Sequence, residues 1–336
     1  MNPTRLRRAA LALLAALAWG STARAQPADG RVFLPFLDAP PEGTLINKPP
    51  TLELVIHGHR QRVEMDTGST GVVLAAHDIP HIDRLPSEGP GTLTYSSSGR
   101  IMRGHWVRTR LTIRGADGAE VHTRPLPVLA IERIECQRTA RSCRPSEHPR
   151  GVAMMGMGFA RERDHQPEGT PEHNPFLNLE RQEARRGYTV TRRGVWLGVT
   201  DAGTAGFSTV SLQRAEGADD WSPAPVCLTL NAGAPACGSV LVDTGVTTMY
   251  LTVPDPSGGM ARSLVEGTRI GIGLLPNAGP TYTVTVGDRS DPAAPDAITL
   301  VPRGKRPFVN TSVRFLNRFD YLYDADRGLV GYRPLP

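Results

Sequence analysis

The chain has 336 residues, 39% of them hydrophobic, and a formal net charge of +5. Four arginines and no acidic residue fall within residues 1–25, so the rest of the chain carries 34 basic and 33 acidic side chains. This length allows one large core or two units of about 150 residues, and the near-neutral balance argues against a nucleic-acid or membrane-surface partner.

Residues 1–25 have the layout of a secretion signal. An arginine-rich start precedes an 11-residue apolar stretch over residues 9–19, which is too short to span a membrane as a helix. The small-x-small sequence of residues 23–25 matches a cleavage site and places the mature N-terminus at Gln26. We therefore expect an exported protein, periplasmic or extracellular, with no membrane anchor.

Alternating apolar residues predict a β-hairpin that leads into an acidic triplet. Leu52, Leu54 and Ile56 alternate before a turn at residues 57–59, and a second alternating run ends at Asp66. Asp66 opens an Asp-Thr-Gly triplet, and another apolar run follows it. A carboxylate between two strands is expected to lie at a strand–loop junction.

The rest of the chain is predicted to be rich in strands and turns. Glycine (35) and proline (30) are both frequent, which favours many turns and few long helices. Further strands are expected at residues 107–113, 194–199, 282–286 and 298–301. Short helices are expected at residues 175–185 and 312–319.

The four cysteines fit an oxidising compartment. They are Cys136, Cys143, Cys227 and Cys237, and their spacing does not match a zinc knuckle. Four cysteines allow three pairings, of which pairing between sequence neighbours is the simplest. A bond between Cys227 and Cys237 would close the hairpin that residues 227–242 are predicted to form.

A second unit repeats the plan of the first. A strand pattern at residues 227–230, a turn at 231–235 and a second strand pattern at 239–242 precede Asp243, which opens the second Asp-Thr-Gly triplet. Two such units facing each other would bring Asp66 and Asp243 together. Paired carboxyl groups are the arrangement that an acid/base, water-activating site needs.

Taken together, these segments resemble the pepsin-like aspartic peptidases of the bacterial secreted type, over nearly the whole mature chain. The segments that carry the resemblance are the triplets at residues 66–68 and 243–245, the flap-like run at 94–99, the apolar-apolar-Gly segment at 154–159, and the closing segments at 315–324 and 328–332.

The resemblance implies an all-β fold with a few short helices, in which two pseudo-symmetric, β-barrel-like lobes enclose a cleft. The N-terminal lobe would cover residues 26–195 and carry the flap. The C-terminal lobe would cover residues 196–336.

The resemblance also implies an activity, that of an acid endopeptidase that hydrolyses an extended polypeptide with an activated water. It implies a monomer that needs no metal ion or organic cofactor. The implied site residues are the catalytic Asp66 and Asp243, the loop-supporting Thr67, Gly68, Ser69, Thr244 and Gly245, and the flap residue Tyr95.

Two departures from the family pattern favour an alternative. Val246 stands where the second motif usually carries a hydroxyl, which would bond the outer oxygen of its Asp. The polar run at residues 310–312 occupies the place of the second apolar-apolar-Gly segment, so it needs hydrogen bonds of its own. The alternative is a catalytically silent binding or inhibitory protein with the same fold.

Overall fold

The protein is described here by a computed structural model, which covers residues 29–140, 143–161, 166, 171–217, 219–254, 259–275, 279–301 and 306–336. The predicted signal lies outside these residues. The chain is all-β, as the sequence predicts, and its strands form three sheets. No helix in the described ranges is long and apolar enough to cross a membrane.

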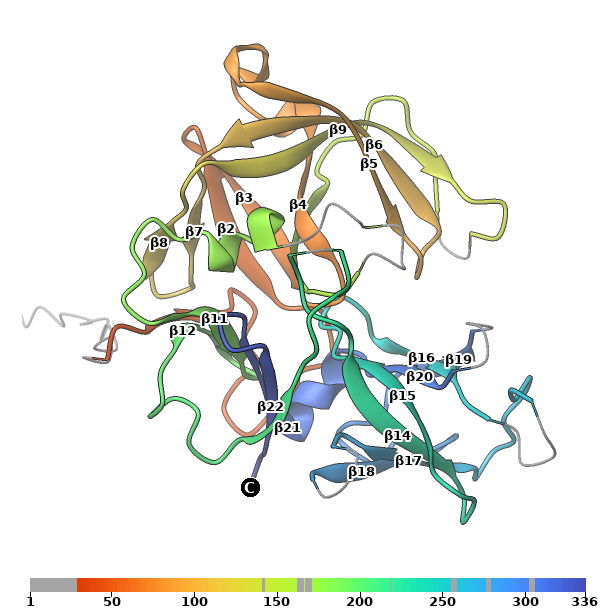
Figure 1. Cartoon of the computed structure of the whole chain (residues 1–336). Coiled ribbons are helices and arrows are strands. Elements are labelled where there is room, and N and C mark those ends of the chain that lie inside the picture. Colours follow the sequence, from red (N-terminus) through yellow and green to blue (C-terminus); the bar gives the residue numbers. More distant parts are fainter. Residues whose placement is uncertain are drawn as a thin grey trace, which may run out of the picture.

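The largest sheet has nine strands, all between residues 51 and 157, and lies at the top of Figure 1. It includes the predicted hairpin that leads into Asp66. In spatial order its strands are β5 (Ser87–Tyr95), β6 (Arg100–Thr109), β9 (Leu126–Cys136), β4 (Thr70–Ala75), β10 (Ala153–Met157), β3 (His59–Asp66), β2 (Thr51–Ile56), β7 (Thr112–Arg114) and β8 (Glu120–His122).

The second sheet has seven strands, all between residues 224 and 310, and lies at the lower right of Figure 1. In spatial order its strands are β19 (Ala297–Leu300), β16 (Thr248–Thr252), β20 (Phe308–Asn310), β15 (Ala236–Leu241), β14 (Ala224–Leu230), β17 (Arg269–Gly273) and β18 (Thr281–Thr285).

The second sheet repeats the topology of the first. Strands β9, β4, β10, β3, β2, β7 and β8 correspond in order to β19, β16, β20, β15, β14, β17 and β18. Each of the six neighbouring pairs has the same direction, parallel or antiparallel, in both sheets. The β5–β6 hairpin is the addition that distinguishes the first sheet. The repeat places the two Asp-Thr-Gly triplets at equivalent points.

A third sheet of six strands combines segments from distant parts of the chain. It contains both the first described strand and the last strand of the chain, and it lies at the lower left of Figure 1. Its strands are, in order, β1 (Val32–Pro35), β12 (Gly194–Val199), β11 (Arg185–Val190), β21 (Phe319–Asp324), β22 (Leu329–Pro334) and β13 (Ser208–Ser211). The predicted boundary between residues 195 and 196 falls inside β12 and stays a prediction.

The two predicted helices are wrong in type and length. The described chain is helical only in short 3₁₀ segments: η1 (Ala76–Asp78), η2 (Ile82–Arg84), η4 (Pro171–His173), η5 (Pro175–Leu177) and η6 (Val313–Asn317). Asn174 caps η5 by accepting a hydrogen bond from the Phe176 N–H (3.0 Å), and the chain then enters β11. Segment η6 leads directly into β21. The apolar residues of both segments are buried in the core. Contact with the core therefore explains why these residues are apolar.

The predicted strand at residues 107–113 is interrupted. Strand β6 ends at Thr109 and β7 begins at Thr112. Between them the Leu111 N–H donates to the side chain of Thr123 (2.9 Å). The chain thereby leaves the pairing of β6 with β9 and joins β2 on the other side of the sheet.

Both disulfides join sequence neighbours, which confirms the simplest of the three pairings. Cys227 and Cys237 face each other across β14 and β15, and Cys136 bonds Cys143 at the end of β9.

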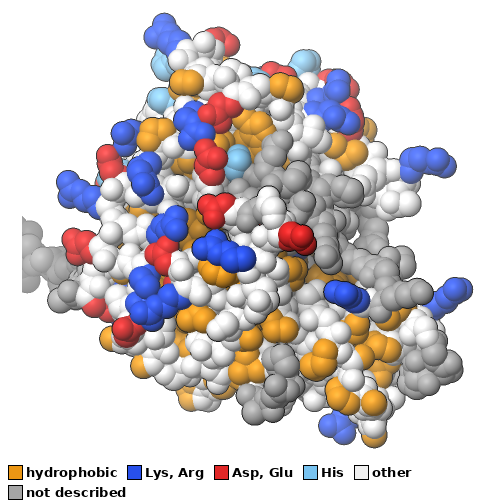
Figure 2. Space-filling model, in the orientation of Figure 1, with side chains coloured by type: hydrophobic (Ala, Val, Ile, Leu, Met, Phe, Trp, Pro, Cys, Tyr) orange, Lys and Arg blue, Asp and Glu red, His pale blue; other side chains and the backbone are white. Residues whose placement is uncertain are grey.

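Figure 2 shows acidic and basic side chains interspersed over one face of the molecule, without a single-sign patch.

Candidate active site

The two Asp-Thr-Gly triplets meet at the bottom of one cavity. Asp66 ends β3 and Asp243 follows β15, and each side chain is 5% exposed. A Cβ atom on Gly68 would lie 2.1 Å from Cγ of Asp243, and one on Gly245 would lie 2.4 Å from Cγ of Asp66. Each carboxyl group therefore lies against the glycine of the other triplet, where no larger residue fits. The Asp66 carboxyl also lies close enough to the Asp243 carboxyl to raise its pKa.

Reciprocal hydrogen bonds between Thr67 and Thr244 join the loops. The N–H of each threonine donates to the hydroxyl of the other, at 3.0 and 3.1 Å. The hydroxyl of Thr67 donates to the Val242 carbonyl (2.6 Å), and that of Thr244 donates to the Met65 carbonyl (2.7 Å). All of these groups are buried, so the network fixes the separation and orientation of the carboxyl groups.

The inner oxygens of the two carboxyl groups have equivalent partners, but the outer oxygens do not. The Gly68 N–H donates to Oδ1 of Asp66 (2.6 Å), and the Gly245 N–H donates to Oδ1 of Asp243 (2.8 Å). On the outer side, the Ser69 hydroxyl donates to Oδ2 of Asp66 (2.5 Å). Val246 offers Asp243 no such hydroxyl.

Asn310 supplies the bond that Val246 cannot. Its side-chain amide donates to Oδ2 of Asp243. Strand β20, which ends at Asn310, pairs with β15 and β16 as β10 pairs with β3 and β4, so the polar run does lie behind the second loop. The sequence does show a polar residue directly after the apolar Phe308 and Val309. It does not identify Asp243 as the partner of that residue.

The surroundings of Asp243 favour the protonated form of its carboxyl group. Burial raises the pKa of Asp243 well above its usual range, and the neighbouring Asp66 carboxyl raises it further. The Asn310 amide and the positive charge of Arg161 oppose this rise. Two carboxyl groups this close hold one proton between them, and the pair titrates as a unit.

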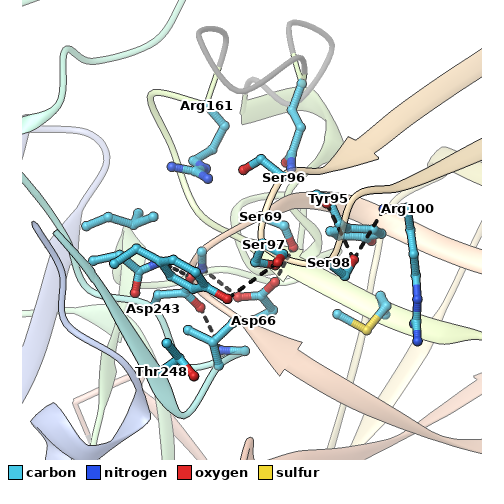
Figure 3. Close-up of a pocket in the computed structure, with 18 of the residues that line it drawn as sticks. Asp66, Ser69, Tyr95, Ser96, Ser97, Ser98, Arg100, Arg161, Asp243 and Thr248 are labelled. Atoms are coloured by element: carbon cyan, nitrogen blue, oxygen red, sulfur yellow. Dashed lines mark hydrogen bonds between the residues drawn. The ribbon is translucent and has the colours of Figure 1, made fainter. Parts of the chain in front are cut away.

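The cavity above the pair has a volume of about 480 Å³ and is lined by both halves of the chain. The β5–β6 hairpin covers it, with its tip at residues 96–99 (Figure 3). The Tyr250 hydroxyl donates to the Ser97 carbonyl (3.4 Å), which links the tip to β16 in the other sheet. The volume is typical of a binding site for a small ligand or a few residues of a peptide.

Tyr95 anchors this hairpin. It is 8% exposed and belongs to a small apolar cluster beneath β5 and β6 that includes Leu93, Met102 and Trp106. Burial raises the pKa of Tyr95 well above its usual range, and the charge of Asp66 adds to this. Tyr95 therefore lies on the cavity wall beside Asp66 as a neutral phenol.

Glu64 is an ionisable residue of the cavity that the sequence did not identify. It lies two residues before Asp66 on β3 and lines the same cavity. Burial raises its pKa to about 8, with a further contribution from Asp66 and an opposing one from Arg100. Glu64 is therefore neutral in acid and neutral solution.

We expect Glu64→Gln to stabilise the protein increasingly as the pH rises. The folded-state pKa of about 8 lies above the ordinary value of 4.5, so between these values the native state binds more protons than the unfolded state and stability falls with pH. The variant removes this loss, which should be about 4 kcal/mol at pH 8. Urea unfolding should give similar free energies for both proteins at pH 4 and a more stable variant at pH 8. The exposed Glu42→Gln should show no such divergence.

Asn310→Leu should shift the pH dependence of any reaction that the pair catalyses. In the wild type the hydrogen bond from Asn310 lowers the pKa of Asp243. Its loss in the variant should raise that pKa and move the alkaline limb of the kcat/KM profile to higher pH by about one unit. Adding Val246→Thr offers a new hydroxyl and should move the limb back. An unchanged profile in Asn310→Leu would show that the amide does not act on Asp243.

Among the described residues, no group of three or more His, Cys, Asp or Glu side chains is arranged to hold a metal ion. Comparison with models of known protein families finds no match, and comparison with curated protein sequences finds no relative.

Proposed function

We propose that the protein is an aspartic endopeptidase with the bilobal fold of the pepsin-like family. The observation that supports this best is the pair of buried carboxyl groups, Asp66 and Asp243, each lying against the glycine of the other triplet. The repeated strand order supports the bilobal fold, with one lobe for each repeat. In this proposal the lobes are residues 26–195 and 196–336.

The proposed reaction follows from the shared proton. The ionised carboxyl of the pair takes a proton from a water molecule held between the two groups, and that water attacks the scissile carbonyl carbon. The protonated carboxyl donates its proton to the carbonyl oxygen, which gives a tetrahedral diol without a covalent enzyme intermediate. The carboxyl that took the proton of the water then gives it to the leaving nitrogen, and a diol hydroxyl returns a proton to the other carboxylate. The C–N bond breaks, an amine and a carboxylic acid leave, and the pair again holds one proton.

The proposed substrate is an extended polypeptide that lies across the cavity beneath the β5–β6 hairpin. Closure of that hairpin, with Tyr95 on the cavity wall, would exclude bulk water from the carboxyl groups. Two disulfides and the predicted secretion signal support an exported enzyme, periplasmic or extracellular. We propose that it acts as a monomer without a metal ion or organic cofactor.

The direct test is cleavage of a denatured protein by the mature chain across about pH 3–7, the range that a carboxyl pair favours. We expect cutting that pepstatin, an inhibitor of carboxyl-pair peptidases, suppresses. Absence of cutting at every pH, together with retained binding of unfolded polypeptide, would instead favour the silent binding protein. Cutting that resists pepstatin but stops with a serine or metal reagent would reject the carboxyl pair as the centre.

A further inference from the structure

The two repeats differ in one residue that faces the cavity at equivalent positions. Glu64 lies two residues before Asp66 on β3, and Leu241 lies two residues before Asp243 at the end of β15. Both residues line the cavity, and each is paired with the strand behind its loop, β10 in the first repeat and β20 in the second. The second repeat therefore shows that this position of the fold accepts an apolar side chain.

The carboxyl group of Glu64 has no direct partner among the residues that the structure describes. Asp66, Asp38 and Arg100 act on it through their charges, but neither a hydrogen bond nor an ion pair joins it to another described side chain. A carboxyl group that leaves water without a partner costs free energy, and a leucine here would avoid that cost. A ligand that binds the carboxyl group would offset it.

Apolar side chains lie beside Glu64 in the cavity. Met154 is the residue of β10 that pairs with Glu64, so the two side chains lie on the same face of the sheet. Met154 also packs against the small cluster that contains Tyr95 and Met102, and all three of these residues line the cavity. A ligand side chain at this end of the cavity therefore meets both apolar walls and a carboxyl group.

Glu64 lies within reach of a substrate residue next to the cut. Residues two apart on a strand point to the same face and are separated by about 7 Å, so Glu64 is this far from Asp66 along β3. A side chain that flanks the scissile bond can span this distance while its peptide bond lies at the acidic pair. Lysine and arginine combine an apolar stem, which suits the two methionines, with a cation that suits the carboxyl group.

We propose that the end of the cavity around Glu64 is a subsite for a lysine or arginine side chain of the substrate, with the Glu64 carboxylate as its ionic partner. The proposal rests on the endopeptidase function proposed above and names its substrate class: polypeptides with a basic residue beside the cut.

The ionisation of Glu64 makes this preference depend on pH. Asp66 and Asp38 favour its neutral form and Arg100 favours its ionised form, while Tyr95 is itself neutral. In Figure 3 Arg100 lies beyond Tyr95, at the same end of the cavity. Glu64 has a pKa of about 8 in the free protein, and a bound cation lowers the pKa of a carboxyl group. A basic side chain therefore binds with release of a proton, and its binding strengthens as the pH rises.

The experiment compares peptides that differ only in one side chain. A peptide that the mature protein cuts is made with Met, Gln, Lys or Arg at each residue flanking the cut. At one of these positions kcat/KM for Lys or Arg should exceed that for Met by about tenfold at pH 6.5, since charge-assisted hydrogen bonds contribute at this level. The ratio should be smaller at pH 4.5. Effects of pH on the acidic pair cancel in this ratio.

Variants of Glu64 test its part in the preference. Glu64→Gln should bring the ratio to about one at both pH values, and Glu64→Leu, which copies the second repeat, should favour Met. Glu64→Asp keeps a carboxyl group on a shorter side chain and should keep part of the preference. The exposed Glu42→Gln removes one acid elsewhere and should leave the ratio unchanged.

Three results would overturn the subsite: equal or slower cutting of the basic peptides by the wild type, a preference for Gln over Lys and Arg, or a basic preference that persists in Glu64→Gln. An equal change for all peptides in Glu64→Gln, with a shifted pH profile, would also overturn it, because Glu64 would then act only through Asp66. If no peptide is cut, the endopeptidase function fails, and equilibrium binding of the same labelled peptides to wild type and Glu64→Gln still tests the subsite.

Discussion

Asp66→Asn and Asp243→Asn are each expected to lower peptide cleavage by more than about a thousandfold. An amide at either residue can neither take a proton from the attacking water nor transfer one to the carbonyl oxygen, so one of the two proton transfers is lost. Both substitutions preserve the shape of the side chain. The measurement is kcat/KM at the pH optimum of the wild type, with a peptide that the wild type cuts.

A measurement of the free energy of unfolding distinguishes the loss of a catalytic carboxyl group from misfolding. Because burial and Asp66 raise the pKa of Asp243, the native state holds a proton that the unfolded state loses near neutrality, and this lowers stability there. Asp243→Asn should therefore unfold at pH 7 with an equal or larger free energy than the wild type. The exposed Asp83→Asn serves as the control and should leave both cleavage and stability unchanged. Full cleavage by either active-site variant would show that the pair is not the reaction centre.

Thr67→Val and Thr244→Val are expected to reduce both stability and cleavage. Thr67→Val leaves the Thr244 N–H without its acceptor and the Val242 carbonyl without its donor, and both groups are buried. Each unsatisfied buried group costs about 1–3 kcal/mol, so urea unfolding should show a loss of about 2–6 kcal/mol. Cleavage per folded molecule should also fall, because the two carboxyl groups lose the bonds that fix their separation.

Two further variants test whether the threonines act specifically. Thr67→Ser keeps the hydroxyl and should retain most of the activity. Thr123→Val removes another fully buried hydroxyl, which accepts from the Leu111 N–H away from the acidic pair. It should lower stability without changing kcat/KM per folded molecule. If Thr67→Val behaved like Thr123→Val, the cross-loop bonds would be structural only.

The strands around the acidic pair could be predicted because their signals are local. Leu52, Leu54 and Ile56 alternate and are all buried in β2, and the hairpin that they begin reaches Asp66 at the end of β3. A period of two in hydrophobicity identifies a half-buried strand from its own residues. The same signal marks β14, the first strand of the hairpin before Asp243.

The type and length of the helical segments at residues 175–185 and 312–319 could not be predicted from the sequence. Phe176 and Leu177, and Phe315 and Leu316, are buried in the core although each pair lies in a 3₁₀ segment of three to five residues. Short apolar runs do not separate a helix from a loop packed on the core. After η6 the next strand, β21, begins at Phe319, which leaves no room for a longer helix there.

The sequence by itself determined two hairpins, two Asp-Thr-Gly triplets and their order, because each depends on residues adjacent in the chain. Only the tertiary structure decided that Asn310 bonds an aspartate 67 residues away, that Arg161 faces the same carboxyl group, and that Glu64 is neutral beside Asp66. These properties arise from burial and from contacts between distant segments. Charge and hydrogen bonding at the site therefore depend on how the two repeats pack, which the local pattern does not specify.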